Sequence, residues 1–165
     1  MRSNTVLGKT KSGTQIVLVT GGSRGVGFSV VEKMVASGAI VIITARNKDK
    51  LKAAQEKLGR NSHYNVCDVS NRLQVKELVD WIMRTFGRID IFVNNAGTNT
   101  GRRSLADMPP EEWDRIMAVN ATGAYNVVYN VLPLMRRQKS GLIVCISSIA
   151  GRVPSSRGGF AYSAS

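Results

Sequence analysis

A glycine-rich stretch near the start of the chain is the first part of the sequence that could do chemistry. The run TGGSRGVG, residues 20–27, lies between a segment typical of a buried strand and a segment typical of a helix. A turn from a strand into a helix brings free backbone amides to the positive end of the helix dipole, and this geometry binds a pyrophosphate. The alternative is a tight turn without a ligand, because glycine clusters are common in turns.

The end of the second predicted strand bears on the same chemistry. In a dinucleotide site, an acid about 20 residues beyond the glycine loop binds the adenosine ribose of NAD. This sequence has TARN at residues 44–47, with no acid at the strand end. Arg46, and Arg24 in the loop, can each pair with a 2′-phosphate, which a carboxylate would repel. We therefore predict NADP (NADPH) rather than NAD as the cofactor. The alternative is that both arginines are solvated surface residues.

The glycine spacing also points to a family. It is G-x-x-x-G-x-G rather than the better-known G-x-G-x-x-G, and it resembles the short-chain dehydrogenase/reductase family. Three further motifs match this family in order, namely CDV at 67–69, NNAG at 94–97 and VNATG at 119–123. Each motif alone is weak evidence, because such pairs are common turn chemistry. Together they extend the resemblance over residues 15–165, with 3-oxoacyl-acyl carrier protein reductase-like members among the similar proteins.

The resemblance implies a set of cofactor contacts. In the family, the aspartate after the third strand meets the adenine amino group, and the NNAG turn steadies the sheet and borders the cofactor. The cofactor-binding residues expected here are Gly21, Ser23, Arg24, Gly25, Val26, Gly27, Arg46, Asp68, Val69, Asn95, Ala96 and Gly97. No metal site is expected, because no residues have the spacing of metal ligands.

The resemblance also implies a reaction centre for carbonyl reduction. It identifies Ser148 as the active-site serine, Tyr162 as the tyrosine and Asn120 as the catalytic asparagine, with the adjacent Ser147 as an alternative to Ser148. A tyrosine hydroxyl can protonate the forming alkoxide, and a serine hydroxyl can stabilise the charge that develops on the carbonyl oxygen. In the family, the asparagine holds a water that relays the proton.

One expected residue lies past the end of the sequence. The family has a lysine four residues after the tyrosine, where it binds the nicotinamide ribose and tunes the tyrosine, and this position follows Ser165. We interpret the chain as C-terminally truncated and expect hydride transfer between NADPH and a carbonyl or alcohol only in a complete form that carries this lysine. The alternative is a catalytically inactive, truncated nucleotide-binding isoform. Expected partners are a small-molecule or acyl-carrier-bound carbonyl substrate and, for the full-length form, further copies of the chain.

The elements that must position these residues follow from the apolar pattern. Strands alternate with helices at a spacing typical of βαβ units, which predicts a doubly wound parallel α/β sheet of the Rossmann type, incomplete at its C-terminus. Strands are predicted at 15–20, 39–44, 64–67, 89–94 and 142–147, and helices at 26–37, 48–58, 71–86 and from 109 toward 137. The last helix is expected to be irregular at Pro133, which lacks a backbone donor. The fifth strand is expected to form an exposed hydrophobic edge.

Composition and charge narrow the remaining possibilities. The net charge is +12, but the basic residues are scattered and no recognition-helix or zinc-knuckle pattern accompanies them. We therefore expect no nucleic-acid partner, although a basic nucleic-acid-binding module is a third alternative. No apolar run approaches the roughly 20 residues of a membrane-spanning helix, so no membrane partner is expected.

The termini and cysteines suggest a reducing compartment. Residues 1–14 are expected to form a flexible basic arm, separate from a partial dinucleotide-binding domain at 15–165. The arm has no apolar signal-peptide core, which favours a cytoplasmic protein; organellar targeting by the basic N-terminus is the alternative. Cys67 and Cys145 each lie late in an apolar strand pattern, so both are expected to be buried free thiols.

Overall fold

Five parallel strands form the centre of the molecule, as the alternating pattern predicts. The computed structural model describes residues 13–153 and 159–165, so the predicted arm at 1–14 lies almost entirely outside the described residues. The strands are β1 (Ile16–Thr20), β2 (Ile40–Ala45), β3 (Ser62–Val66), β4 (Ile91–Asn94) and β5 (Leu142–Cys145). Their order in the sheet is β3-β2-β1-β4-β5, and each pairs in parallel with its neighbour. The chain thus winds outward in both directions from β1, which is the doubly wound topology.

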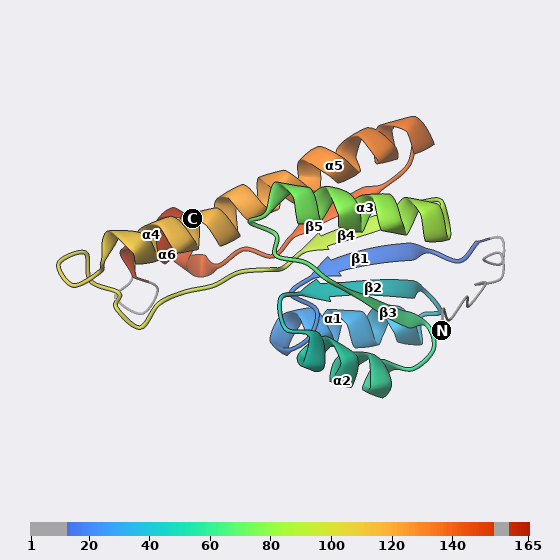
Figure 1. Cartoon of the computed structure of the whole chain (residues 1–165), viewed down its shortest axis with the longest axis horizontal. Coiled ribbons are helices and arrows are strands. Elements are labelled where there is room, and N and C mark those ends of the chain that lie inside the picture. The colour runs from blue at the N-terminus through green and yellow to red at the C-terminus, as the bar shows by residue number, and fades with distance from the viewer. Residues whose placement is uncertain (1–12, 154–158) are drawn as a thin grey trace.

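Helices cover both faces of this sheet. The helical elements are α1 (Gly25–Ala36), α2 (Lys48–Leu58), α3 (Arg72–Phe86), α4 (Pro110–Met117), the π-helical η1 (Ala118–Thr122), α5 (Gly123–Gln138), the 3-10 segment η2 (Ile149–Gly151) and α6 (Phe160–Ala164). Helices α1 and α2 lie on one face, and α3 and α5 lie on the other (Figure 1). Helix α4 and the short α6 lie beyond the carboxyl ends of the strands (Figure 1).

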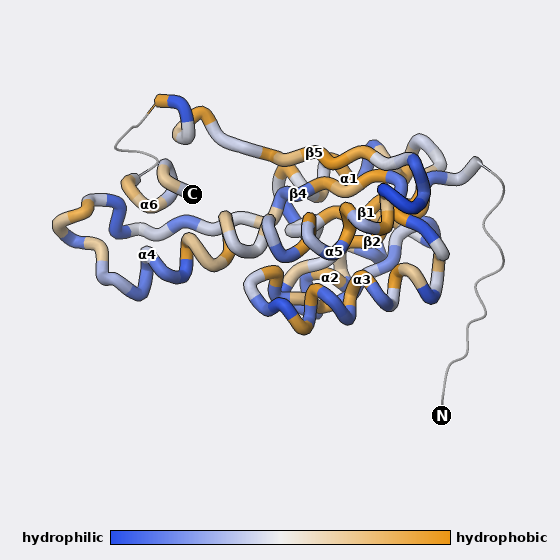
Figure 2. The backbone as a smooth tube through the Cα atoms, turned by 90° about the horizontal axis from the view of Figure 1, so that it is seen from above, coloured by the Kyte–Doolittle hydropathy of each residue, from blue (hydrophilic) through white to orange (hydrophobic). Residues whose placement is uncertain are grey.

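The core divides into one apolar cluster on each side of the sheet. Strand β1 is buried along its whole length, because both of its faces are covered by helices. Alternate residues of β1 enter the two clusters, with Leu18 on the α3–α5 side and Val19 on the α1–α2 side. Figure 2 shows this apolar interior as hydrophobic colour along the strands, with hydrophilic residues on the outer helices.

Side-chain caps fix where two of the helices begin. The Asn47 side chain accepts a hydrogen bond from the Lys50 amide at 2.9 Å, and Asn71 accepts from the amides of Leu73 and Gln74. These bonds satisfy amides that have no partner within the first turn of a helix. Helix α3 ends at Gly87, whose φ of +77° is favourable for glycine. The helices therefore begin and end close to the predicted positions.

The structure corrects the predicted course of the long helix after residue 109. The helix continues without interruption through Pro133, where the irregularity was expected. The break lies instead at the π-helical η1, between α4 and α5. A π-segment accommodates an extra residue in the turn, and such segments are frequent at functional sites. Here it contains Asn120, one of the predicted catalytic residues.

The edges of the sheet account for two further differences. Strand β3 begins at Ser62 rather than at residue 64 and ends at Val66, so Cys67 lies just after it. Cys145 is exposed rather than buried as expected, because among the described strands β5 pairs with β4 alone and lies at the end of the sheet. The side chain of Leu142 is 54% exposed on the same strand. The expectation that β5 forms an exposed hydrophobic edge is thus confirmed.

Candidate functional site

The glycine loop lies at the point where the winding of the sheet reverses. Strands β1 and β4 are neighbours, although two strands and three helices separate them in the sequence. In open α/β sheets, ligands bind at the carboxyl ends of the strands at such a switch point. The loop after β1 and the NNAG turn after β4 therefore face each other across this crevice.

Thr20 and Asn95 connect the two sides of the switch point. The buried Thr20 hydroxyl accepts hydrogen bonds from the backbone amides of Asn95 and Ala96, both at 3.1 Å. In return, the Asn95 side-chain amide donates to the carbonyls of Thr20 at 3.0 Å and of Gly21 at 3.2 Å. The NNAG turn thus holds the beginning of the glycine loop in place, as the resemblance implied for a turn that steadies the sheet.

Glycine is required at two positions of the loop for steric reasons. Gly21 has a φ of +68°, and a Cβ there would lie 2.9 Å from the Asn95 side-chain nitrogen. At Gly27, a Cβ would lie 2.6 Å from the Gly21 carbonyl oxygen. Real Cβ atoms do not approach other heavy atoms so closely, so any side chain would force the loop away from α1. The glycine pattern therefore allows α1 to begin directly against the end of β1.

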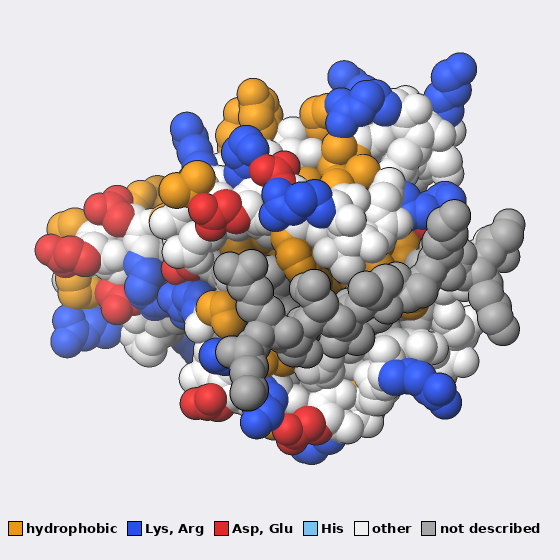
Figure 3. Space-filling view, turned by 45° about the vertical axis from the view of Figure 1, so that its right-hand side comes forward, with side chains coloured by type: hydrophobic (Ala, Val, Ile, Leu, Met, Phe, Trp, Pro, Cys, Tyr) orange, Lys and Arg blue, Asp and Glu red, His pale blue; other side chains and the backbone are white. Residues whose placement is uncertain are grey.

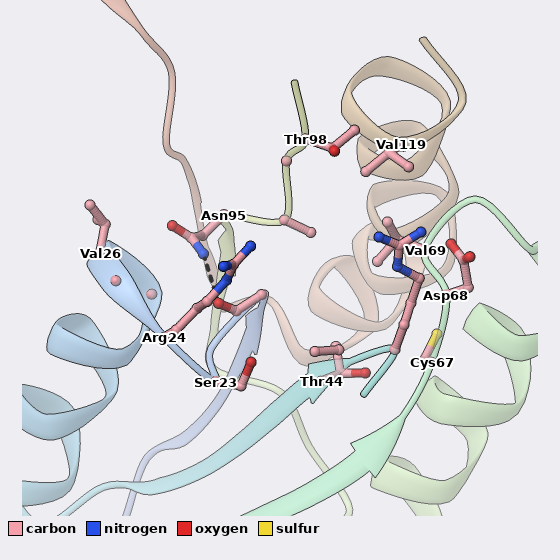
Figure 4. Close-up of a pocket in the computed structure, with 17 residues that line it drawn as sticks. Ser23, Arg24, Val26, Thr44, Cys67, Asp68, Val69, Asn95, Thr98 and Val119 are labelled. Carbon is pink, nitrogen blue, oxygen red and sulfur yellow. Dashed lines mark hydrogen bonds between the residues drawn. The ribbon is translucent and has the colours of Figure 1, made fainter. Parts of the chain in front are cut away.

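A pocket of about 480 Å³ opens at these strand ends. Its volume lies within the roughly 300–1,000 Å³ that is usual for small-molecule sites. The lining contains every residue predicted to bind the cofactor: Gly21, Ser23, Arg24, Gly25, Val26, Gly27, Arg46, Asp68, Val69, Asn95, Ala96 and Gly97. Figure 4 shows Arg24, Asp68 and Asn95 among them, on loops that follow different strands.

Other lining residues were not predicted from the sequence. They are Thr44, Ala45, Cys67, Thr98 and Val119. Four of them adjoin predicted residues at strand ends and could have been found from their position alone. Val119 lies in the π-segment, whose Asn120 side chain hydrogen-bonds to Thr98 in the loop after β4, and Figure 4 shows Val119 and Thr98 on the same side of the pocket.

The pocket has an uneven charge distribution. Arg24 and Arg46 line it and are both exposed, and neither guanidinium forms an ion pair with any residue that the structure describes. The acid in the lining is Asp68, whose Oδ1 accepts hydrogen bonds from the Ser70 amide at 3.0 Å and hydroxyl at 2.7 Å. This turn fixes the carboxylate after β3, while the arginine side chains remain available to an anion.

Helix α5 holds the residue that follows Asp68. The buried Asn126 side chain donates a hydrogen bond to the Val69 carbonyl at 2.9 Å. A Cβ at Gly123 would lie 2.7 Å from the Val69 side chain, so the glycine allows α5 to approach closely. Val69 therefore has a fixed position in the pocket wall.

Basic side chains elsewhere on the surface do not gather into one patch. On the face shown in Figure 3, Lys and Arg side chains lie at separate places, with Asp and Glu side chains between several of them. In the described ranges 13–153 and 159–165, no group of His, Cys, Asp or Glu side chains could hold a metal ion. None of the helices in these ranges is long and apolar enough to cross a membrane.

The two cysteines differ in environment, and this difference predicts their reactivity. Burial, together with the nearby Asp68 carboxylate, raises the pKa of the Cys67 thiol to about 11. Cys145 is exposed on β5. Because the thiolate is the reactive form, Cys67 is expected to stay neutral and unreactive at pH 8, whereas the exposed Cys145 is accessible to a reagent. A colorimetric disulfide reagent is expected to titrate about one thiol in the native chain and about two in denaturant.

The control for this prediction is Cys145→Ser, which should abolish the fast reaction and leave only the thiol exposed by denaturant. Equal rates for both thiols in the native chain would contradict the assignment. Between about pH 9 and about pH 11, the Cys67 thiol ionises in the unfolded chain but stays protonated in the folded chain, because its folded-state pKa is raised. Ionisation then favours the unfolded state, so the free energy of unfolding should fall as the pH rises through that interval.

The predicted catalytic residues lie on elements that contact one another, outside the lining of the pocket. Ser148 precedes η2, and its hydroxyl accepts a hydrogen bond from the Ala150 amide at 3.2 Å. Ser148 is half-buried, whereas its alternative Ser147 is exposed. Helix α6, which carries Tyr162, contacts η2 and α4. The Asn120 side chain donates to the Ser165 hydroxyl at 2.8 Å and so connects the π-segment to the end of α6.

Contacts on the other side of α6 fix its place over α4. The Phe160 ring lies 5.6 Å from the Trp113 ring, measured between centroids. The Phe160 amide donates to the Arg103 carbonyl at 3.2 Å, and Ala161 is buried. These contacts hold the tyrosine helix beyond the carboxyl ends of β4 and β5.

The family model described as short chain dehydrogenase matches residues 15–165. The chain belongs to this family. Among curated short chain dehydrogenase relatives, the 3-oxoacyl-[acyl-carrier-protein] reductase of Thermotoga maritima is 37% identical over 140 residues, covering 83% of this chain and 56% of that protein. The 3beta-hydroxysteroid dehydrogenase 2 of Eggerthella lenta is 36% identical over 155 residues, covering 92% of this chain and 59% of that protein. The chain thus spans between half and two thirds of the length of these relatives.

Solved structures of the family have the same fold. A metagenomic short-chain oxidoreductase in complex with NADP matches with a TM-score of 0.85 and 36% identity, covering 91% of this chain and 69% of that one. The serine dehydrogenase from Escherichia coli matches with the same TM-score and 33% identity. The Rossmann-type assignment therefore agrees with both the strand order and these structures.

Proposed function

We propose that this chain binds NADP(H) in the pocket at the carboxyl ends of its strands. The observation that carries the proposal is the composition of the pocket: the glycine loop, a fixed Asp68, and the exposed guanidinium groups of Arg24 and Arg46. The backbone amides at the start of α1 suit a pyrophosphate, and the arginines suit a 2′-phosphate. We assign this role to residues 15–165, a partial dinucleotide-binding domain, and propose residues 1–14 as a separate basic arm.

We further propose that the complete protein interconverts a carbonyl compound and an alcohol. When bound, NADPH supplies the hydride. The Tyr162 hydroxyl then gives a proton to the carbonyl oxygen as it becomes an alkoxide, and the Ser148 hydroxyl donates a hydrogen bond to the same oxygen. The Asn120 side chain bonds Ser165, and this contact holds the helix that carries Tyr162. In the complete protein, the lysine expected after Ser165 would bind the nicotinamide ribose and tune Tyr162.

The substrate class follows from what the chain resembles. Relatives are named for reduction of a 3-oxoacyl group on an acyl carrier protein and for oxidation of a 3β-hydroxysteroid. We propose a small-molecule or carrier-bound carbonyl substrate, with the +12 charge favouring an acidic carrier. We also propose that the full-length form assembles from identical copies.

Titration of the purified chain with NADPH and NADH tests the cofactor proposal. NADPH is expected to bind at least about tenfold more tightly, because a charge-assisted hydrogen bond to the 2′-phosphate contributes roughly 1.5–3 kcal/mol. Isothermal titration calorimetry at low salt measures both dissociation constants. Equal affinities, or no binding of either nucleotide, would refute the proposal.

A further inference from the structure

Arg115 connects helix α4 to the wall of the pocket. Its guanidinium donates a hydrogen bond to the Thr98 hydroxyl oxygen at 2.8 Å and to the Asn99 carbonyl at 3.0 Å. The same guanidinium pairs with the Glu112 carboxylate at 2.6 Å and 3.2 Å, one helical turn earlier. A planar guanidinium held by a carboxylate on its own helix has little freedom, so its remaining N–H groups have fixed directions.

A second residue of the same helical run holds the backbone of Thr98. The Asn120 side chain accepts a hydrogen bond from the Thr98 amide at 2.8 Å and donates one to the Thr98 carbonyl at 3.0 Å. Both backbone groups of Thr98 are therefore satisfied. Its hydroxyl oxygen accepts from Arg115, which leaves the hydroxyl proton to donate elsewhere.

The position of Thr98 determines which part of a dinucleotide it would meet. The strand ends follow the order Asp68 after β3, Arg46 after β2, the glycine loop after β1 and Thr98 after β4. If the pyrophosphate binds at the glycine loop and the adenosine lies toward Arg46, the other half of the nucleotide extends toward Thr98. Thr98 and Val119 form the wall of the pocket there (Figure 4).

We propose that Thr98 donates a hydrogen bond to the nicotinamide riboside half of the cofactor and that Arg115 is the positioning residue that orients it. This inference rests on the proposed binding of NADP(H) in this pocket. It assigns Arg115 a role through Thr98 rather than through contact with the ligand. The Glu112–Arg115 pair, about one third exposed on both sides, serves to hold the guanidinium in place.

Two ligands separate this role from general support of the fold. NADPH carries both halves of the dinucleotide, whereas 2′-phospho-ADP carries the adenosine, the 2′-phosphate and the pyrophosphate but no nicotinamide riboside. The variants Thr98→Val and Arg115→Met are each expected to weaken NADPH binding about fivefold, the usual effect of one lost hydrogen bond. Binding of 2′-phospho-ADP should change less than twofold. Arg115→Lys keeps the positive charge but loses the planar guanidinium with its several N–H donors, so its NADPH affinity should resemble that of Arg115→Met.

A matched control and a double variant complete the experiment. Glu111→Gln removes an exposed acid of α4 outside this cluster and should leave both affinities unchanged. The Thr98→Val/Arg115→Met double variant should bind NADPH no more weakly than either single variant, because both act on the same hydrogen bond. Additive losses, or equal losses for the two ligands, would overturn the proposal.

The same measurements distinguish the two levels of inference. Suppose that the wild-type chain binds both 2′-phospho-ADP and NADPH, but that each variant changes the two affinities by the same factor or not at all. The proposed role of Thr98 and Arg115 is then refuted, while the binding of NADP(H) stands. If wild-type chain binds neither ligand, the proposed function fails and this inference fails with it. Thermal unfolding of each variant shows whether Arg115→Met is folded at the titration temperature. If it is not, the Thr98→Val variant tests the proposal, because valine has nearly the same shape as threonine.

Discussion

Replacing Arg46 with glutamate is expected to weaken NADPH binding roughly 100-fold while changing NADH binding by only a few-fold. The substitution removes a charge-assisted hydrogen bond, which contributes about 1.5–3 kcal/mol, and adds repulsion between the new carboxylate and the 2′-phosphate. The carboxylate can instead accept hydrogen bonds from the free ribose hydroxyls of NADH. The cofactor preference of the chain should therefore reverse, as measured by calorimetric titration with both nucleotides.

Arg60→Glu is the matched control for this prediction. Arg60 is an exposed arginine outside the pocket lining, so the same charge change there should leave the preference for NADPH intact. The effect of Arg46→Glu should also shrink as salt is raised, because Arg46 is exposed and the Debye length falls to about 3 Å at 1 M salt. If Arg46→Glu retains the wild-type preference, Arg46 does not contact the 2′-phosphate.

The second large effect is expected on turnover. We expect the 165-residue chain to bind NADPH but to consume it at least about 100-fold more slowly than a chain extended past Ser165 by the expected lysine and a C-terminal segment taken from the Thermotoga maritima reductase. Assistance by a positioned acid or base contributes roughly 10²–10⁴-fold to rate, and the extension supplies the tyrosine's partner. Loss of NADPH absorbance with a 3-oxoacyl thioester measures the rate.

Variants of the extended chain assign the roles within this prediction. Tyr162→Phe should lower kcat by a similar factor while leaving NADPH affinity unchanged, because the ring remains and only the hydroxyl is lost. Ser148→Ala should lower kcat more than Ser147→Ala, since Ser148 is the half-buried serine next to η2. Equal turnover by the 165-residue and extended chains would show that the added lysine is unnecessary and would refute this prediction.

The pocket illustrates how far sequence motifs can predict a site. Each predicted cofactor-binding residue lies in the loop after a predicted strand or at the start of the helix that follows, and the carboxyl ends of parallel strands meet at one edge of a sheet. Once the alternating pattern indicated a parallel sheet, the motifs had to come together there. Thr98 carried no motif, and Val119, the first residue of the VNATG motif, was not among the predicted cofactor-binding residues. Both line the pocket where Asn120 of the π-segment hydrogen-bonds to Thr98.

Where the sequence pattern failed, the missing information was tertiary. Pro133 was expected to disturb its helix, but the helix continues through it, and the break falls at η1, where Asn120 turns toward Thr98. Cys145 was expected to be buried because its strand is apolar. Its exposure follows from the edge position of β5, which outweighs the apolar character of the strand.

The sequence by itself determined the alternation of strands and helices, the glycines that allow α1 to begin at β1, and the arginine that replaces an acid after β2. These are local properties, because they depend on backbone sterics, apolar periodicity and side-chain charge within short segments. Only the tertiary structure decided that Arg115 and Asn120 both hold Thr98, and that α6, the helix of Tyr162, contacts η2. Such contacts join residues far apart in the chain, and their geometry follows from how whole elements pack.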